Sequence, residues 1–164
     1  MNRTKRLTAL ALLTAAAMVL SYVETLLPSP GIPGVKLGLA NIAVIFALCR
    51  LGGKEAAAIS LIRVGMVSLL FGSLGALAYS LAGAALSLLV MILLRRTDRF
   101  SLVGVSVAGG VSHNLGQILM AMWMLETRRL IWYLPVLILT GLGGGILVGL
   151  CGALLVRRVP GGGA

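Results

Sequence analysis

Long apolar runs alternate with short breaks of charged, proline and glycine residues along the whole chain. These runs predict helices near residues 6–27, 36–50, 54–73, 76–95, 102–126 and 131–157. A helix needs about 20 residues to cross the hydrocarbon core of a bilayer. The second run is the shortest, because only residues 37–49 are free of charge, and it is either a short span or a partly re-entrant segment. The pattern predicts an all-α integral membrane bundle of about six transmembrane helices.

Two of the connections have distinct compositions. The loop at residues 28–36, PSPGIPGVK, holds three prolines and two glycines, so we expect an ordered, non-helical cap at the outer face. The segment from Gly72 to Gly75 carries no charge and predicts a tight hairpin between the third and fourth helices. We therefore expect one transmembrane domain over residues 1–158, followed by a flexible tail at 159–164.

The composition agrees with this membrane pattern. Of 164 residues, 59% are hydrophobic and only 11% are charged, whereas roughly a quarter of the residues in soluble domains are charged. The opening MNRTKR and its apolar run resemble a secretory signal, but further apolar runs follow, so we interpret this segment as the first membrane helix.

The net charge of +10 reflects basic residues at helix ends and does not indicate a nucleic-acid partner. Lysines and arginines in short connections favour the cytoplasmic side. One predicted side collects Arg3, Lys5, Arg6, Arg50, Lys54, Arg95, Arg96, Arg99, Arg157 and Arg158, and the other holds Lys36, Arg128 and Arg129. Both termini are therefore expected in the cytoplasm.

Arg63 is the most informative polar residue, because it lies about three turns into the third predicted helix. A charge at that depth needs a carboxylate, backbone carbonyls or an anionic ligand as its partner. The alternative is an arginine that extends to the membrane interface or pairs within the protein.

A second polar cluster lies on the fifth predicted helix. Gly110, His113, Asn114 and Gln117 are spaced by three and four residues, so they share one face of the helix. This face is either a ligand-recognition surface or a set of hydrogen bonds to neighbouring helices.

Three residues near the predicted outer face could complete a pocket with Arg63 and that helix face. They are Glu24, Lys36 and Asn41. Lys36 together with Arg63 would favour a small anionic molecule, although an isolated lysine at a helix end can also be an interfacial anchor.

Two stripes of small residues allow close approach of another backbone. The last helix carries Gly141, Gly145, Gly149 and Ala153, which predict helix packing. The first helix carries Ala11 and Ala15, which predict either an internal contact or a docking surface for another membrane subunit.

The sequence gives little support for catalysis or for a cofactor. The four acidic residues, Glu24, Glu55, Asp98 and Glu126, lie in different segments and form no carboxylate pair. His113 is the only histidine, and Cys49 and Cys151 lack the spacing of metal or redox motifs, so we expect no metal site. No glycine-rich nucleotide loop ending in Lys-Ser or Lys-Thr is present, so any work driven by ATP must come from a partner.

Three stretches resemble the motifs of a bacterial membrane family, labelled Gx transporter or heptaprenyl diphosphate synthase component I. They are PGVKLGLANI at 33–42, SLIRVG at 60–65 and SHNLGQ at 112–117. The resemblance extends from the first helix to Arg158, and it implies an inner-membrane protein whose functional positions are the polar members of the motifs: Lys36, Asn41, Arg63, His113, Asn114 and Gln117.

That family is similar in layout to the substrate-binding S components of energy-coupling factor (ECF) transporters, six-helix proteins that bind vitamins from outside. The similarity implies a coupling subunit and ATPases as partners. It also implies that Ala11 and Ala15 match the alanine-rich helix that docks on the coupling subunit. The leading hypothesis is therefore a substrate-binding subunit for a small anionic nutrient.

Two other hypotheses remain open. One is a non-catalytic membrane accessory of heptaprenyl diphosphate synthase in isoprenoid or quinone synthesis, since prenyl synthases use aspartate-rich motifs and this chain has one aspartate, Asp98. The other is a structural subunit of a redox or transport complex, in which the polar residues only join helices.

Overall fold

The computed structural model describes residues 2–26 and 38–159, which form six α-helices and one short 3-10 helix. The elements are α1 (Arg3–Leu26), α2 (Asn41–Arg50), α3 (Gly53–Phe71), α4 (Leu74–Arg96), α5 (Leu102–Met124), η1 (Arg128–Tyr133, the 3-10 helix) and α6 (Leu134–Arg158). The described residues contain no strand. The prediction of an all-α bundle is confirmed.

The surface of the bundle is that of a membrane protein. Among the described residues, three segments are long and apolar enough to cross a membrane: α1, α4, and the stretch Arg128–Arg158 that contains η1 and α6. Large apolar side chains such as Leu69, Leu74 and Leu139 lie exposed on the outside. A soluble monomer rarely exposes so much apolar surface, whereas lipid accommodates it without cost.

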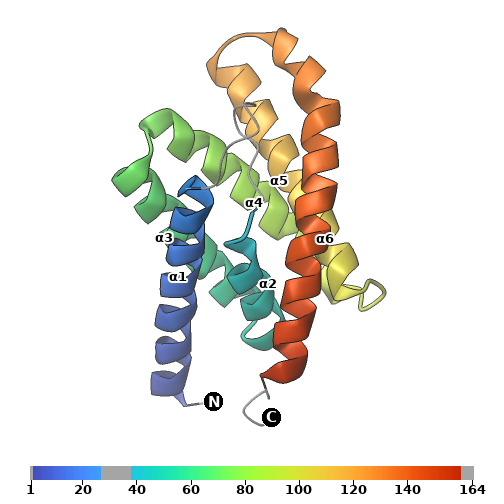
Figure 1. The fold of residues 1–164 in the computed structure, drawn as a ribbon. Coiled ribbons are helices and arrows are strands. Elements are labelled where there is room, and N and C mark those ends of the chain that lie inside the picture. The colour runs from blue at the N-terminus through green and yellow to red at the C-terminus, as the bar shows by residue number, and fades with distance from the viewer. Residues whose placement is uncertain (1, 27–37, 160–164) are drawn as a thin grey trace.

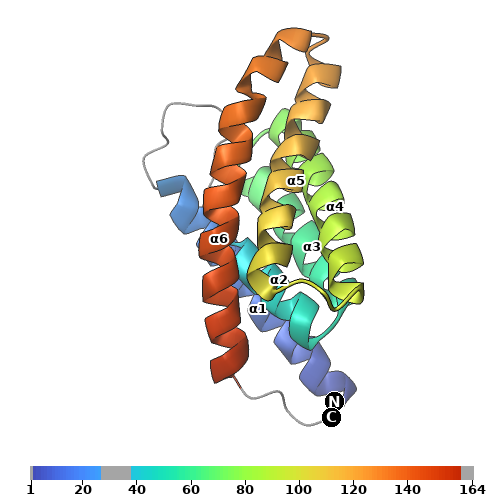
Figure 2. The ribbon, with the colours of Figure 1, turned by 90° about the vertical axis from the view of Figure 1, so that its right-hand side faces the viewer.

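The six α-helices form two groups, one of α4, α5 and α6 and the other of α1, α2 and α3, which meet where α3 contacts α4 and α2 contacts α6. α5 packs along both α4 and α6, and this sheet-like layer of three helices is clear in Figure 2. α1 packs on α3 and α2, and α2 also contacts α6, so the short α2 lies between α1 and α6 (Figure 1). α1 begins and α6 ends at the same end of the bundle (Figure 1).

The core consists mainly of small and branched side chains centred on α2. Val44, Ile45 and Ala47 of α2 are almost fully buried, and Ile59 of α3 and Val105 of α5 pack in the same cluster. Small core residues let helices approach closely, which is how membrane bundles gain packing energy without a hydrophobic effect between helices.

The second helix begins later than its hydrophobic pattern predicts. α2 starts at Asn41, and the predicted helix over residues 38–40 is wrong, because Gly38 has a positive φ of 75° and the next two residues form a turn. The predicted start at residue 36 and the predicted cap at 28–36 lie outside the described residues.

The other boundaries are close to the predicted ones. α3 and α4 are joined by two residues, and the Ser73 hydroxyl accepts a hydrogen bond from the Ala76 N–H at 3.2 Å. The last helix differs at its start, where residues 131–133 belong to η1. Pro135 then lies in the first turn of α6, the position that tolerates its missing N–H.

Candidate functional site

A small cavity lies inside the bundle and is lined by residues of all six α-helices. Its volume is about 50 Å³, which is room for only one or two water-sized groups, since one water occupies about 30 Å³ in the liquid. Five of the predicted substrate-binding residues line it: Asn41, Arg63, His113, Asn114 and Gln117. The structure thus brings together residues from three helices that are far apart in the sequence. Lys36, the sixth, lies outside the described residues.

Arg63 reaches the cavity from the middle of α3. Its NH1 group is 3.5 Å from the hydroxyl oxygen of Ser21 on α1, which is the outer limit of a hydrogen bond. Its Nε atom is buried and has no hydrogen-bond partner among the described residues. A buried donor without a partner costs about 1–3 kcal/mol, and more when it carries charge, so the side chain of Arg63, which lines the cavity, keeps one donor unsatisfied.

Glu24 brings the one carboxylate to the described lining of the cavity. It accepts a hydrogen bond from the N–H of Gly38, and the Gly38 carbonyl in turn accepts from the Asn41 N–H at 2.8 Å, where α2 begins. Glu24 thereby fixes the start of α2 beside the cavity. It also lies near enough to Arg63 to interact with it electrostatically.

The polar side chains of α5 point toward two neighbouring helices, α6 and α4. The Asn114 amide donates to the Leu137 carbonyl at 2.6 Å and to the Thr140 hydroxyl at 3.3 Å, both on α6. Asn114 therefore makes the helix-to-helix hydrogen bonds that were one of the two interpretations of this face.

His113 and Gln117 lie on the other side, against Gly83 of α4. A Cβ atom at Gly83 would lie 2.8 Å from Gln117 Cγ and 3.1 Å from His113 Cε1. Any larger residue at position 83 would displace both side chains from the cavity wall. The sequence offered only a weak signal for Gly83, its place in a run of small residues.

Glycines of α5 and α6 form the wall between the two helices. A Cβ at Gly110 would lie 2.6 Å from the Gly141 carbonyl oxygen, and one at Gly145 would lie 2.6 Å from the Cα of Val107. Gly149 is similarly close, with 2.8 Å between its ideal Cβ and Val103 Cα. Ala153, the last member of the small-residue stripe, is half-buried. The close approach of these backbones leaves the cavity small.

The small residues of α1 are placed differently. Ala11 and Ala15 are both exposed, on a surface that also exposes Leu12 and Val19. Within the described part of the chain, both therefore lie on an exposed, mainly apolar surface of α1.

Sequence reasoning missed Ser21 and Thr140, the two hydroxyl groups nearest to Arg63 and Asn114. Serine and threonine are common in membrane helices as backbone-bonded residues, so neither had a distinguishing spacing. Their roles become visible only when the helices are packed.

Comparison with models of known protein families matches residues 13–155 to the family described as heptaprenyl diphosphate synthase component I. Comparisons with curated proteins and with solved structures gave no significant match. The matched region includes α2 to α5, η1, the second half of α1, most of α6 and all the described residues of the cavity.

Proposed function

Because the chain belongs to the heptaprenyl diphosphate synthase component I family, we propose that it is a multi-pass inner-membrane subunit that binds a small anionic molecule and acts through partner proteins. The observation that carries this proposal is the convergence of Asn41, Arg63 and His113 on one internal cavity, with a buried Arg63 Nε that has no partner within the described chain.

The proposed membrane placement follows from charge and surface. All six α-helices would span or enter the bilayer, with the apolar exterior facing lipid. The end of the bundle where α1 begins and α6 ends would face the cytoplasm, because basic residues of the short connections favour that side.

The proposed ligand group is an anion held by Arg63. Its guanidinium would donate through the unused Nε, and the amides of Asn41 and Gln117 line the same space. The Glu24 carboxylate already accepts a hydrogen bond from the Gly38 N–H. This bond weakens the competition of Glu24 with the anion for the guanidinium of Arg63. A cavity of about 50 Å³ accommodates one carboxylate- or phosphate-sized group, so a whole nutrient, which needs a pocket of about 300 Å³ or more, requires the helices to separate.

The proposed mode of action is that of an S component. A membrane coupling subunit would dock on the exposed Ala11 and Ala15 surface of α1, since small side chains allow close helix contact. ATPases bound to that subunit would supply the energy. In this arrangement the chain binds its ligand and performs no chemistry.

The family description favours a second candidate function, a non-catalytic accessory of heptaprenyl diphosphate synthase. In that case Arg63 would contact a diphosphate, and a separate subunit would carry out prenyl transfer. The carboxylates of this chain are dispersed: Glu55 pairs with Arg6 and Asp98 pairs with Arg95. Such an arrangement suits an accessory better than a magnesium diphosphate catalyst.

One experiment distinguishes the transporter subunit from the synthase accessory. The protein is affinity-purified from native membranes in a mild detergent, and the retained proteins and small molecules are identified by mass spectrometry. ATPases together with a membrane coupling subunit are expected for the transporter. Recovery of a soluble prenyl synthase subunit would replace the transporter with the accessory function.

Variants test the site in the same preparation. Arg63→Ala and His113→Ala should reduce the retained anion by about tenfold or more, because a charged hydrogen bond is lost. Arg128→Ala removes the same charge from an exposed position in η1 and should leave retention unchanged. Unchanged retention in Arg63→Ala would exclude this cavity as the site.

A further inference from the structure

A second cavity lies at the end of the bundle where α1 begins, between the end of α2, the start of α3 and the end of α4. Its volume is about 440 Å³, which falls within the range of about 300–1,000 Å³ typical of ligand pockets. Its lining combines the basic residues Lys54, Arg95 and Arg96 with the apolar residues Leu48, Ala57 and Ile92. It shares no lining residue with the central cavity.

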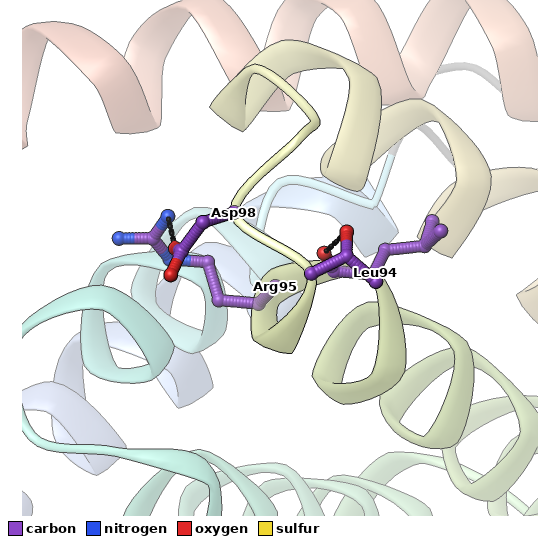
Figure 3. Close-up of polar contacts among 4 residues, drawn as sticks. Leu94, Arg95 and Asp98 are labelled. Carbon is purple, nitrogen blue, oxygen red and sulfur yellow. Dashed lines mark hydrogen bonds and ion pairs between the residues drawn. The ribbon is translucent and has the colours of Figure 1, made fainter.

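No carboxylate is among the residues that line this second cavity in the described chain. Glu55, which follows Lys54, is buried and forms an ion pair with Arg6 of α1. Asp98 lies 3.5 Å from Arg95 across the connection after α4, as Figure 3 shows, and its side chain is 83% exposed. Exposed pairs of this kind contribute little, so the cavity keeps an excess of positive charge on Lys54 and Arg96.

An apolar face of α4 leads from this cavity toward the middle of the bundle. Arg96, Ile92 and Leu89 are spaced by four and three residues, so they follow one another on the same side of the helix. Leu89 is exposed, as is Leu93 beside it. A molecule with an anionic head at Arg96 would therefore meet apolar side chains as it extends toward the middle of the bundle.

We propose that this second cavity binds the phosphate headgroup of an anionic membrane phospholipid, with an acyl chain along the Ile92 and Leu89 face of α4. Basic pockets between membrane helices commonly hold such headgroups. Both halves of the lipid have a counterpart here: three cations at the helix ends for the phosphate, and a partly exposed apolar stripe for the chain. Free phosphate would use only the first of these.

The test uses the full-length protein, delipidated in an uncharged detergent and titrated with phosphatidylglycerol or phosphatidylcholine, with binding followed by native mass spectrometry. Phosphatidylglycerol should bind more tightly than phosphatidylcholine. The double variant Lys54→Gln, Arg96→Gln should bind phosphatidylglycerol roughly 30-fold more weakly, since each basic residue near an anionic lipid surface contributes about fivefold.

Two control variants make the result specific. Arg128→Gln with Arg129→Gln removes the same charge from exposed positions in η1, away from this cavity, and should bind phosphatidylglycerol like the wild type. Lys54→Arg with Arg96→Lys keeps the charge and should retain binding, which separates loss of charge from loss of folding.

Three results would overturn the proposal. They are equal affinity for the two lipids, an equal loss of binding in the Arg128 and Arg129 variant, and displacement of phosphatidylglycerol by an equal concentration of inorganic phosphate, which would assign the cavity to a free anion. The ligand of the central cavity does not enter this measurement, so its outcome is independent of the proposed function.

Discussion

Asn114 and Arg63 line the same cavity but differ in how far the protein satisfies them. The Asn114 amide has two acceptors on α6, whereas the Arg63 Nε has none among the described residues. The first arrangement is that of a structural residue, and the second leaves a donor for a ligand.

Asn114→Leu should therefore lower stability and leave the ligand-binding donor in place. We expect a loss of roughly 0.6–1.7 kcal/mol, the value of an interhelical hydrogen bond in a membrane protein, seen as a lower midpoint of thermal unfolding in detergent. Gln117→Leu is the matched control. Gln117 also lines the cavity, but its side chain makes no hydrogen bond to another described residue. Equal destabilisation by both variants would contradict the assignment of Asn114.

At the scale of the helices, the contact between α5 and α6 depends on glycine at particular positions. An ideal Cβ at Gly145 would lie 2.6 Å from Val107 Cα and 3.0 Å from the Ser106 carbonyl oxygen. Both are backbone atoms of α5. Gly143, two residues earlier on α6, has no atom within 4 Å of its ideal Cβ.

These two glycines give a matched pair of substitutions. Gly145→Ala should destabilise the bundle by about 1–3 kcal/mol, because α5 and α6 must move apart. Gly143→Ala should be neutral or should stabilise by up to about 1 kcal/mol, since alanine favours the helix. Thermal unfolding of the purified variants in detergent measures both, and a destabilising Gly143→Ala would mean that this face of α6 is covered by another chain.

The elements themselves were largely predictable, because each apolar run ends at charged, glycine or proline residues. The start of α2 was not, since it follows a turn at Gly38, which has a positive φ and donates its N–H to the Glu24 carboxylate fourteen residues earlier. A hydrophobic pattern carries no information about such a tertiary hydrogen bond. For α6, the start near Pro135 follows a local rule, but the 3-10 turn before it does not.

Across the whole molecule, the convergence of Asn41, Arg63 and His113 was predictable because each is a polar residue in an apolar run, and such residues turn inward. The size of the cavity was not. It is set by the close approach of α5 and α6 at Gly110 and Gly141, and distances between backbones emerge only from the packed bundle.

The arrangement of the helices also predicts which connections face the same side of a membrane. The connection between α4 and α5 lies toward the end where α1 begins, and the connection between α5 and α6 lies at the opposite end (Figure 1). Thr97 is exposed in the first connection, and Arg129 is exposed at the start of η1 in the second. With Cys49 and Cys151 replaced by serine, each position can carry a single cysteine.

In intact cells, a membrane-impermeant maleimide should label Arg129→Cys and should label Thr97→Cys only after the membrane is broken. The physical reason is the excess of arginine and lysine in the connections at the end where α1 begins, which favours the cytoplasmic side for that end. The reverse labelling pattern would place the central cavity closer to the cytoplasm and remove the basis for capture from outside. Labelling of both positions in intact cells would contradict the proposal that α5 crosses the membrane.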